Sequence, residues 1–186
     1  MKLSGRTYAV LVAEGVEDLE YWVTVMRLRE EGATVVSVGS DTEPHRGKNG
    51  LSVQADALPF DVDVDELDGL VIPGGFAPDK MRRDAAILAL VRAAYDRGLP
   101  IGIICHGGSV AISAGIVGAR ATGSLGIKDD LLLAGAEWVD EPAFRDGQIV
   151  WGRVVADIPD FERELVAAFA EAGEAVTVKR GRRARA

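Results

Sequence analysis

The sequence contains a single cysteine, Cys105, directly after the apolar run Ile101 to Ile104 and directly before His-Gly-Gly. A thiol at the end of a buried strand, followed by small residues, is typical of a nucleophile on a tight strand-to-helix turn. Such a turn points the sulfur at the N-terminus of the next helix, where partial positive charge favours the thiolate. The sequence therefore predicts Cys105 as a reactive nucleophile; the alternative is a buried, inert cysteine.

Proton transfer at this sulfur has two candidate partners, His106 and Glu20. An imidazole transfers protons near neutral pH, although adjacent side chains seldom face each other, so a structural histidine is the alternative. Glu20 lies three residues after Glu17 at a predicted helix start and flanks an apolar stripe. Partial burial would keep its proton on, so the acid could donate a hydrogen bond to a thiolate. Glu17, on the same side of the helix start, is a secondary candidate for contact with the sulfur, although for Glu17 and Asp18 a favourable interaction with the helix dipole is the simpler explanation.

Backbone amides after two predicted strands could form an oxyanion hole. Gly74 and Gly75 follow the apolar run Gly69 to Ile72. Their turn and the turn at His106 can each offer one backbone N–H group to a developing negative charge. Gly107 leaves room for a tight turn behind the nucleophile. The alternative for the two glycines after the first run is an ordinary loop.

The apolar patterning predicts the elements that position these groups. Buried strands are expected at Thr7 to Ala13, Thr34 to Val38, Gly69 to Ile72 and Ile101 to Ile104. The first helix ends at Gly32, with a stripe of Leu19, Trp22, Val23 and Met26. Further helices are expected at Asp79 to Arg97, Gly107 to Ala114, Ile127 to Ala134 and Phe161 to Ala172. Hairpins are expected around Gly47 to Asn49 and, at Asp146-Gly147, between Glu137 and Trp151.

Strands that alternate with helices predict an α/β fold with a mostly parallel, doubly wound sheet covered on both faces. Ligands of such folds bind beyond the carboxyl ends of the strands, where the candidate residues fall. The length of 186 residues fits one domain, expected over residues 1–173. Residues 174–186 form a basic C-terminal tail, for which disorder is the simpler expectation.

The composition excludes several classes of function. A single cysteine with two histidines cannot form an internal disulfide or a cysteine-rich zinc site, so neither a metal nor a cofactor is expected. The net charge of −8 makes nucleic acid an unlikely main partner. No apolar run approaches the roughly 20 residues that cross a bilayer, and no secretory signal is evident. We therefore expect a soluble, cytoplasmic protein. His45 is expected to be a solvated surface group.

The assembled motifs resemble the PfpI family of the class I glutamine-amidotransferase-like superfamily. The resemblance runs from about Tyr8 to about Phe169. It is carried by Gly-Val-Glu-Asp-Leu-Glu at 15–20, Asp-Gly-Leu-Val-Ile-Pro-Gly-Gly at 68–75, Ile-Cys-His-Gly at 104–107, Ile-Ser-Ala-Gly at 112–115 and Gly-Ile-Lys-Asp-Asp at 126–130. Together these motifs are highly specific.

The resemblance implies a flavodoxin-like three-layer sandwich with a nucleophile elbow. It implies Cys105 as the nucleophile, Glu20 as its carboxyl partner and His106 as the residue that handles protons. Some family members build the site between subunits of a dimer or hexamer, where an acidic residue of the neighbouring chain orients the histidine. The matching position here is Asp79, for which a helix N-cap is a compatible alternative.

The sequence also departs from the family pattern. Asp79 stands where peptidase-like members commonly have Glu, so its carboxylate reaches one methylene less far. Gly108 replaces a frequent proline, and residues 122–125 lack a tyrosine that is often found near the pocket. These departures bear on the substrate pocket and the triad geometry, and so disfavour peptide hydrolysis.

Three hypotheses follow. The first is a stress-response enzyme of glyoxalase or deglycase type, whose thiolate adds to a reactive carbonyl or glycated amine. The second is an intracellular cysteine peptidase with the two turn amides as oxyanion hole. The third is a non-enzymatic redox sensor or chaperone in which Cys105 is oxidised to a sulfinate that Glu20 stabilises.

Overall fold

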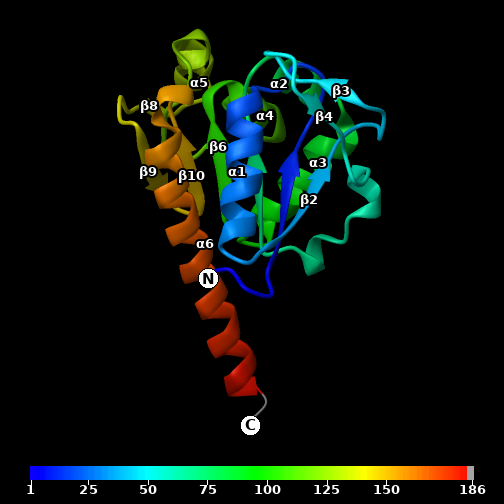
Figure 1. Cartoon of the computed structure of the whole chain (residues 1–186). Helices are drawn as coiled ribbons and strands as arrows, with labels where there is room; N and C mark the ends of the chain where they lie inside the picture. The colour runs from blue at the N-terminus through cyan, green and yellow to red at the C-terminus, as the bar shows by residue number, and fades with distance from the viewer. Residues whose placement is uncertain (184–186) are drawn as a thin grey trace.

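The computed structural model describes the backbone of residues 1–183 and the side chains of residues 1–174. Its central sheet has the strand order β2-β1-β5-β6-β10-β9 (Figure 1). Five of these strands are parallel, and only β9 pairs antiparallel, with β10. Their bounds are β1 Thr7–Leu11, β2 Thr34–Val38, β5 Gly69–Ile72, β6 Ile101–Ile104, β9 Ala143–Asp146 and β10 Ile149–Gly152. The mostly parallel sheet predicted from the sequence is confirmed.

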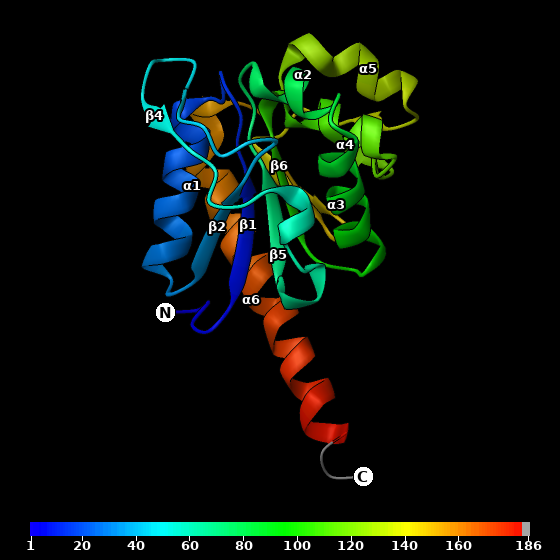
Figure 2. The ribbon, with the colours of Figure 1, turned by 90° about the vertical axis from the view of Figure 1, so that its right-hand side faces the viewer.

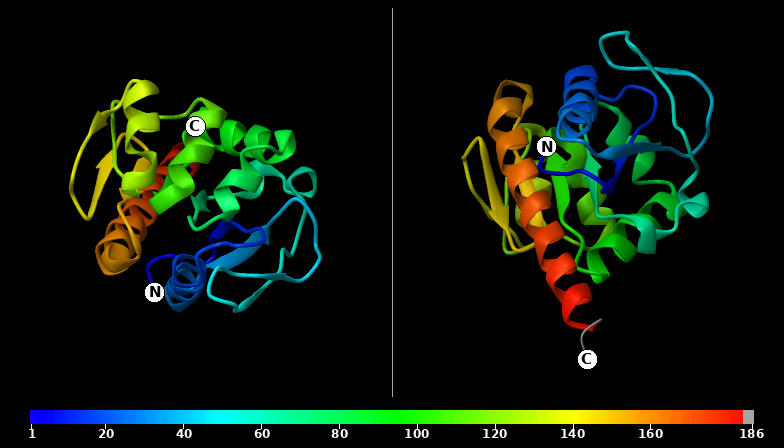
Figure 3. Two further views of the ribbon diagram at one scale, coloured as in Figure 1. Left: turned by 90° about the horizontal axis from the view of Figure 1, so that it is seen from above. Right: turned by 60° about the horizontal axis from the view of Figure 1, so that its bottom comes forward.

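Helices cover both faces of this sheet. On one face lie α1 (Asp18–Glu30) and α6 (Ile158–Arg183), and on the other α3 (Ala85–Asp96) and α4 (Gly108–Ala114), as Figure 2 shows. The short helices α2 (Ala77–Met81) and α5 (Lys128–Leu133) lie near the carboxyl ends of the strands, beside α4 (Figure 3). The three-layer α/β sandwich is therefore confirmed.

Short elements complete the chain. Two small sheets pair β3 (His45–Arg46) with β4 (Ser52–Val53) and β7 (Arg120–Ala121) with β8 (Glu137–Trp138). The 3₁₀ turns are η1 Pro59–Asp61, η2 Val64–Glu66, η3 Cys105–Gly107, η4 Leu125–Ile127 and η5 Val155–Asp157. The β3–β4 and β9–β10 pairs confirm the two predicted hairpins, whereas β8 belongs to a separate sheet.

The helix expected over Asp79 to Arg97 is two helices, so that prediction was wrong. The chain turns after Met81, and α3 begins after Asp84. The Asp84 side chain accepts a hydrogen bond from the backbone N–H of Ala86 at 2.8 Å. An aspartate whose side chain caps free backbone N–H groups favours the start of a helix just after it. The apolar spacing runs through this position and so does not reveal the break between the two helices.

The predicted apolar stripe of α1 was right for Trp22 and Val23, which pack against the core, and wrong for Leu19 and Met26. Leu19 is 49% and Met26 62% exposed, while the face that packs on the sheet carries Tyr21, Val25 and Leu28. Both faces of this helix are apolar, so spacing alone does not identify the buried one. The orientation adopted is the one that buries Glu20 completely, at the carboxyl ends of the strands.

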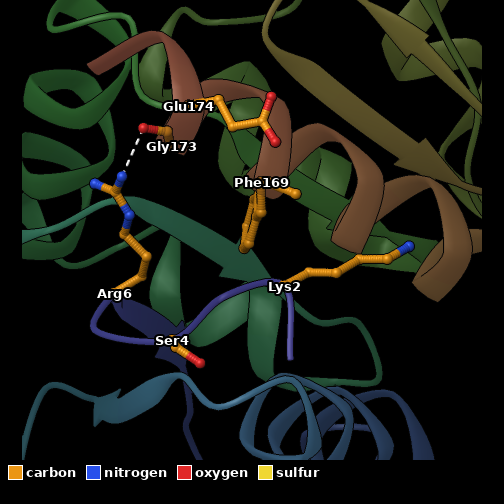
Figure 4. Close-up of a pocket in the computed structure, with 7 residues that line it drawn as sticks. Lys2, Ser4, Arg6, Phe169, Gly173 and Glu174 are labelled. Atoms are coloured by element: carbon orange, nitrogen blue, oxygen red, sulfur yellow. Dashed lines mark hydrogen bonds between the residues drawn. The ribbon is translucent and has the colours of Figure 1, made fainter. Parts of the chain in front are cut away.

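Helix α6 extends beyond the expected Phe161 to Ala172. Phe169 stacks on Tyr8 of β1 with 4.3 Å between ring centroids, which fixes α6 on the sheet. Near the amino end of β1, a hollow of about 400 Å³ separates α6 from the N-terminal segment, and Arg6 bridges it by donating to the carbonyl of Gly173 (Figure 4). The backbone of the basic tail continues α6 as far as Arg183, while its side chains after residue 174 and residues 184–186 lie outside the described part of the chain. The disorder expected for the tail stays a prediction.

No helix in the described part of the chain is both long enough and apolar enough to span a bilayer.

A buried carboxyl joins α6 to α1 and makes stability depend on pH. Glu162 is 4% exposed, accepts a hydrogen bond from the Thr24 hydroxyl, and its Oε2 has no hydrogen-bond partner among the described residues. Burial raises the pKa of Glu162 to about 7, and the hydrogen bond from Thr24 and the charge of Arg27 offset it only in part. Because the folded state holds this proton more tightly than the unfolded chain, its contribution to stability is full below about pH 4.5 and is lost as pH rises through 7.

Glu162→Gln is therefore expected to be more stable than the wild type at pH 8 by about 1–2 kcal/mol, with little difference at pH 4.5. Urea denaturation across this pH range measures the difference between the two proteins. The exposed substitution Glu137→Gln serves as the control. Parallel stability curves for the wild type and Glu162→Gln would show that this carboxyl titrates normally.

Candidate active site

Cys105 lies on a strained turn between β6 and α4. Its φ of +58° is the one positive value at a non-glycine residue within the described backbone. Such strain persists where surrounding structure enforces it and is common at nucleophiles. A β-carbon on Gly107 would lie 2.4 Å from the backbone oxygen of Ile72, so a side chain there would push this turn off the neighbouring strand. The tight turn expected from the sequence is present, and Cys105 as a residue is partly exposed.

Glu20 is fully buried beside the cysteine. Its Oε2 accepts a hydrogen bond from the backbone N–H of Gly74 at 2.7 Å, and its Oε1 is buried without a hydrogen-bond partner among the described residues. A β-carbon on Gly74 would lie 2.7 Å from both the β-carbon of Cys105 and Oε2. Burial raises the pKa of Glu20 to about 7, so a large share of this acid is protonated at neutral pH.

The imidazole of His106 faces the sulfur although the two residues are adjacent. Cys105 Sγ and His106 Nδ1 are 3.3 Å apart, because the positive φ of Cys105 turns the backbone between them. Burial, with the charge of Lys48, lowers the pKa of His106. The ring is therefore neutral at physiological pH and able to accept the thiol proton. No side-chain carboxylate within residues 1–174 hydrogen-bonds the ring.

Two backbone N–H groups point at the sulfur, from Gly75 and His106, and each lowers the pKa of Cys105. Gly75 has a φ of +80°, and a β-carbon there would lie 2.3 Å from the backbone nitrogen of Glu17. Only glycine fits this position. The two amides that the sequence suggested for an oxyanion hole therefore lie at the nucleophile.

The thiol itself is not poised as the sequence suggested. Burial, followed by the negative charge of Glu20, outweighs the two amides and raises the pKa of Cys105 to about 12. The expectation of a thiolate favoured by the helix N-terminus is wrong for this state. A proton on Glu20 removes the opposing charge, so ionisation of the thiol is coupled to protonation of the carboxyl.

Asp79 stands in the first turn of α2, and the N-cap position belongs to Phe76, so the N-cap alternative was wrong. Its side chain is 78% exposed and pairs with Arg83 at 3.2 Å. Asp79 and His106 line the same hollow of about 430 Å³, but no hydrogen bond joins them. The structure therefore leaves Asp79 at the open side of the site.

Glu17, treated above as a helix-dipole residue, holds part of the site together. It is 4% exposed and accepts hydrogen bonds from Lys48 Nζ at 3.1 Å and Asn49 Nδ2 at 2.8 Å. Asp18 likewise accepts from the backbone N–H groups of Asn49 and Leu51. These contacts fasten the β3–β4 hairpin to the start of α1.

Lys48 is the residue near the nucleophile that the sequence reasoning missed. Together with Cys105, His106 and Phe76 it lines a cleft of about 300 Å³, whose remaining walls come from Glu17, Gly75, Ser124, Val154, Val155 and Ala156. The Gly-Lys-Asn-Gly turn opposite an acid-rich helix start was the available signal, through charge complementarity. The cleft lies at the carboxyl ends of β5, β6 and β10, the usual ligand site of this architecture.

The sequence predicted that His45 is a solvated surface group, but in the structure its ring has two carboxylate partners. Its Nε2 lies 2.9 Å from Asp41 Oδ1, and its Nδ1 lies 3.5 Å from Glu14 Oε2. These contacts place it in the base of the hairpin. Within the described residues, no group of three or more His, Cys, Asp or Glu side chains could hold a metal ion.

Comparison with known proteins finds one family and several relatives that match most of this chain. Residues 6–168 match the model of the DJ-1/PfpI family. The chain is 41% identical over 158 residues to Deglycase PH1704 of Pyrococcus horikoshii, covering 84% of this chain and 95% of that protein. It is 36% identical over 158 residues to the putative cysteine protease YraA of Bacillus subtilis, covering 84% and 94%.

Among solved structures, a two-domain protein from Anabaena variabilis with DJ-1/ThiJ/PfpI-like and ferritin-like domains superimposes with a TM-score of 0.85 at 36% identity. The match covers 87% of this chain and 47% of that longer one. With a family match over most of its length and relatives above 35% identity, the chain belongs to the DJ-1/PfpI family.

Proposed function

We propose that the protein is a cysteine-dependent enzyme of glyoxalase or deglycase type, which acts on reactive carbonyls or glycated amines as part of a cytoplasmic stress response. The observation that carries the proposal is the 3.3 Å contact between Cys105 Sγ and a neutral His106 ring at a cleft of about 300 Å³. A cleft of this size fits a small carbonyl compound or the end of a glycated side chain. The deglycase relative named above supports the same activity.

The residues suit addition of sulfur to an aldehyde carbon. His106 Nδ1 accepts the thiol proton, and Sγ of Cys105 forms a bond to the carbon while the carbonyl π electrons move to the oxygen. The N–H groups of Gly75 and His106 stabilise that oxygen, and protonated Glu20 can return a proton to it. The product of this step is a neutral hemithioacetal.

Neither substrate class needs an oxidant. With a 2-oxoaldehyde, His106 first gives up the thiol proton, which restores the acid form of Glu20, and then moves the proton from the former aldehyde carbon to the neighbouring carbon, giving a thioester. Water then hydrolyses the thioester to a 2-hydroxy acid and restores the thiol. With a glycated amine in its carbinolamine form, sulfur bonds to the carbinol carbon as the carbon–nitrogen bond breaks, the amine leaves with the thiol proton, and the same hemithioacetal follows this route. Each route consumes one water overall.

The decisive assay measures conversion of methylglyoxal to lactate by the purified protein, alongside release of free amine from a methylglyoxal-modified lysine derivative. We expect turnover of at least one of these substrates and no cleavage of fluorogenic peptides. Light scattering on the same sample reports the oligomer. Cleavage of peptides without carbonyl turnover would replace the proposal with peptide hydrolysis, and sulfinate formation on mild peroxide with no turnover would favour a redox sensor.

Peptide hydrolysis is the second candidate because two amides converge on the nucleophile and a relative carries the name of a putative cysteine protease. It ranks below carbonyl chemistry because Asp79, Gly108 and residues 122–125 depart from the pattern of peptidase-like members at the triad and the substrate pocket.

Asp79 is proposed to act between subunits of a homo-oligomer. Its side chain is 78% exposed, and within its own chain it lies at the open side of the hollow next to His106. A carboxylate reaching His106 from a second copy would raise the basicity of the ring and orient it. A strictly monomeric protein with full turnover in the light-scattering sample would exclude this role.

A further inference from the structure

Lys48 is held rigidly in place at the tip of the β3–β4 hairpin. Asp18, itself 2% exposed, accepts the backbone N–H groups of Asn49 at 2.6 Å and Leu51 at 2.8 Å. A β-carbon on Gly47 would lie 2.4 Å from the Asp18 carboxylate, so the tip sits directly on that side chain. The backbone N–H of Lys48 also donates to the carbonyl of Val16 at 2.8 Å. The lysine is therefore positioned before any ligand arrives.

The ammonium group of Lys48 reaches into the cleft. Nζ lies 3.1 Å from Glu17 Oε2 and 5.6 Å from the ring centre of Phe76, and the side chain is 42% exposed. An ammonium has three N–H donors, and one of them is directed at Glu17. The remaining donors are free to meet a ligand that sits over Cys105 in the same cleft.

The charge of Lys48 acts on the nucleophile and its partner. Negative charge on Cys105 and on Glu20 raises the pKa of Lys48, after the larger effect of Glu17, and Lys48 in turn lowers the pKa of His106. Such mutual effects require the groups to be close. The ammonium therefore lies within electrostatic range of the reacting atoms.

We propose that Lys48 selects the substrate by binding an oxygen on the atom next to the carbon that Cys105 attacks. This inference rests on the proposed carbonyl chemistry and names its substrate class, 2-oxoaldehydes, with 2-oxo acids as ligands that bind in the same way but give no new product. In a 2-oxoaldehyde the neighbouring oxygen becomes anionic when the proton leaves the former aldehyde carbon, and in a 2-oxo acid such as glyoxylate it is a carboxylate throughout. A fixed ammonium stabilises both.

A purely structural role is the competing explanation, because buried Glu17 needs a cation nearby. The two roles differ in what they do to small reagents. Iodoacetate and iodoacetamide alkylate the same thiolate, and they differ in a carboxylate placed next to the attacked carbon. The fraction of ionised thiol and any general loosening of the site affect both rates equally, so they drop out of the ratio of the two rates. The ratio therefore reports how the site recognises the carboxylate.

The experiment measures both alkylation rates on the full-length wild type, Lys48→Met, Lys48→Arg and the control Lys128→Met. Lys128 is matched because its ammonium also stands over an aromatic ring, 5.5 Å from the centre of Trp138, and it does not line the cleft. We expect the iodoacetate to iodoacetamide ratio to fall about tenfold in Lys48→Met, the size of a lost charge-assisted contact of about 1.4 kcal/mol. Lys48→Arg and Lys128→Met should keep the wild-type ratio within about twofold.

Two results would overturn the inference. An unchanged ratio in Lys48→Met would assign the lysine to Glu17 alone, and an equal fall in Lys128→Met would reduce the effect to net charge. Since the alkylation needs no turnover, the proposed function can fail while this test succeeds. Where methylglyoxal is turned over, its kcat/KM should fall in Lys48→Met, and glyoxylate should inhibit that variant less strongly than it inhibits the wild type.

Discussion

Replacing Cys105 by serine is expected to lower carbonyl turnover by about a thousandfold or more while leaving the fold intact. Every covalent step proposed above begins at this sulfur, and a serine hydroxyl next to an imidazole of lowered pKa ionises far less readily than a thiol. Catalysis that depends on one nucleophile is lost almost entirely when that nucleophile is removed. Initial rates of lactate formation from methylglyoxal measure the effect.

Cys105→Ala is the companion variant. It removes the nucleophile and keeps the β-carbon, so the turn with φ of +58° has the same steric demand as in the wild type. Its thermal unfolding should therefore match that of the wild type closely. If either variant retained more than about a tenth of the wild-type rate, Cys105 would not be the nucleophile, and the carbonyl chemistry would need another residue.

The sequence was informative about features set by local chemistry. Strands β1, β2, β5 and β6 are mainly apolar runs, and the glycines at positions 74, 75 and 107 are required by close approaches of the backbone. Such constraints can be read from a few neighbouring residues. For this reason the parallel sheet, the nucleophile turn and the two amides beside it could all be predicted.

Contacts between segments that lie far apart in the chain could not be predicted from the sequence. Lys48 is brought to the cleft by bonds between the hairpin and Asp18, about thirty residues earlier in the chain, and neither residue stands out alone. Glu20 was expected to be buried only in part, and its complete burial depends on how α1 is turned on the sheet, which apolar spacing predicted only in part. The pKa of Cys105 rises for the same reason, because burial and Glu20 are tertiary effects.

Substituting Glu20 by glutamine separates thiol reactivity from turnover. Glutamine can still accept the hydrogen bond from the Gly74 N–H through its amide oxygen, so the site keeps its shape. It cannot carry negative charge, and the charge of Glu20 is one of the causes that raise the pKa of Cys105. The variant thiol should therefore ionise at lower pH, with burial as the remaining cause of a raised value. It should also lose the proton that Glu20 supplies to the substrate oxygen.

We expect iodoacetamide to alkylate Glu20→Gln at pH 8 about tenfold faster than the wild type, which corresponds to a downward shift of about one unit in the thiol pKa. Over the same pH range, carbonyl turnover should fall by about a hundredfold, because a positioned general acid typically accelerates a reaction by about that factor. Alkylation rates across pH and lactate assays on the same preparations measure the two effects.

Glu162→Gln is the matched control for this pair of measurements. It makes the same chemical change at another buried carboxyl whose pKa burial raises to about 7, far along the chain and without contact to the sulfur. Its alkylation profile and turnover should equal those of the wild type. Superimposable alkylation profiles for Glu20→Gln and the wild type would mean that the carboxyl does not govern ionisation of the thiol. A rise in reactivity together with a fall in turnover is the result expected if the ionised form of Glu20 raises the pKa of the thiol and its protonated form supplies a proton during the reaction.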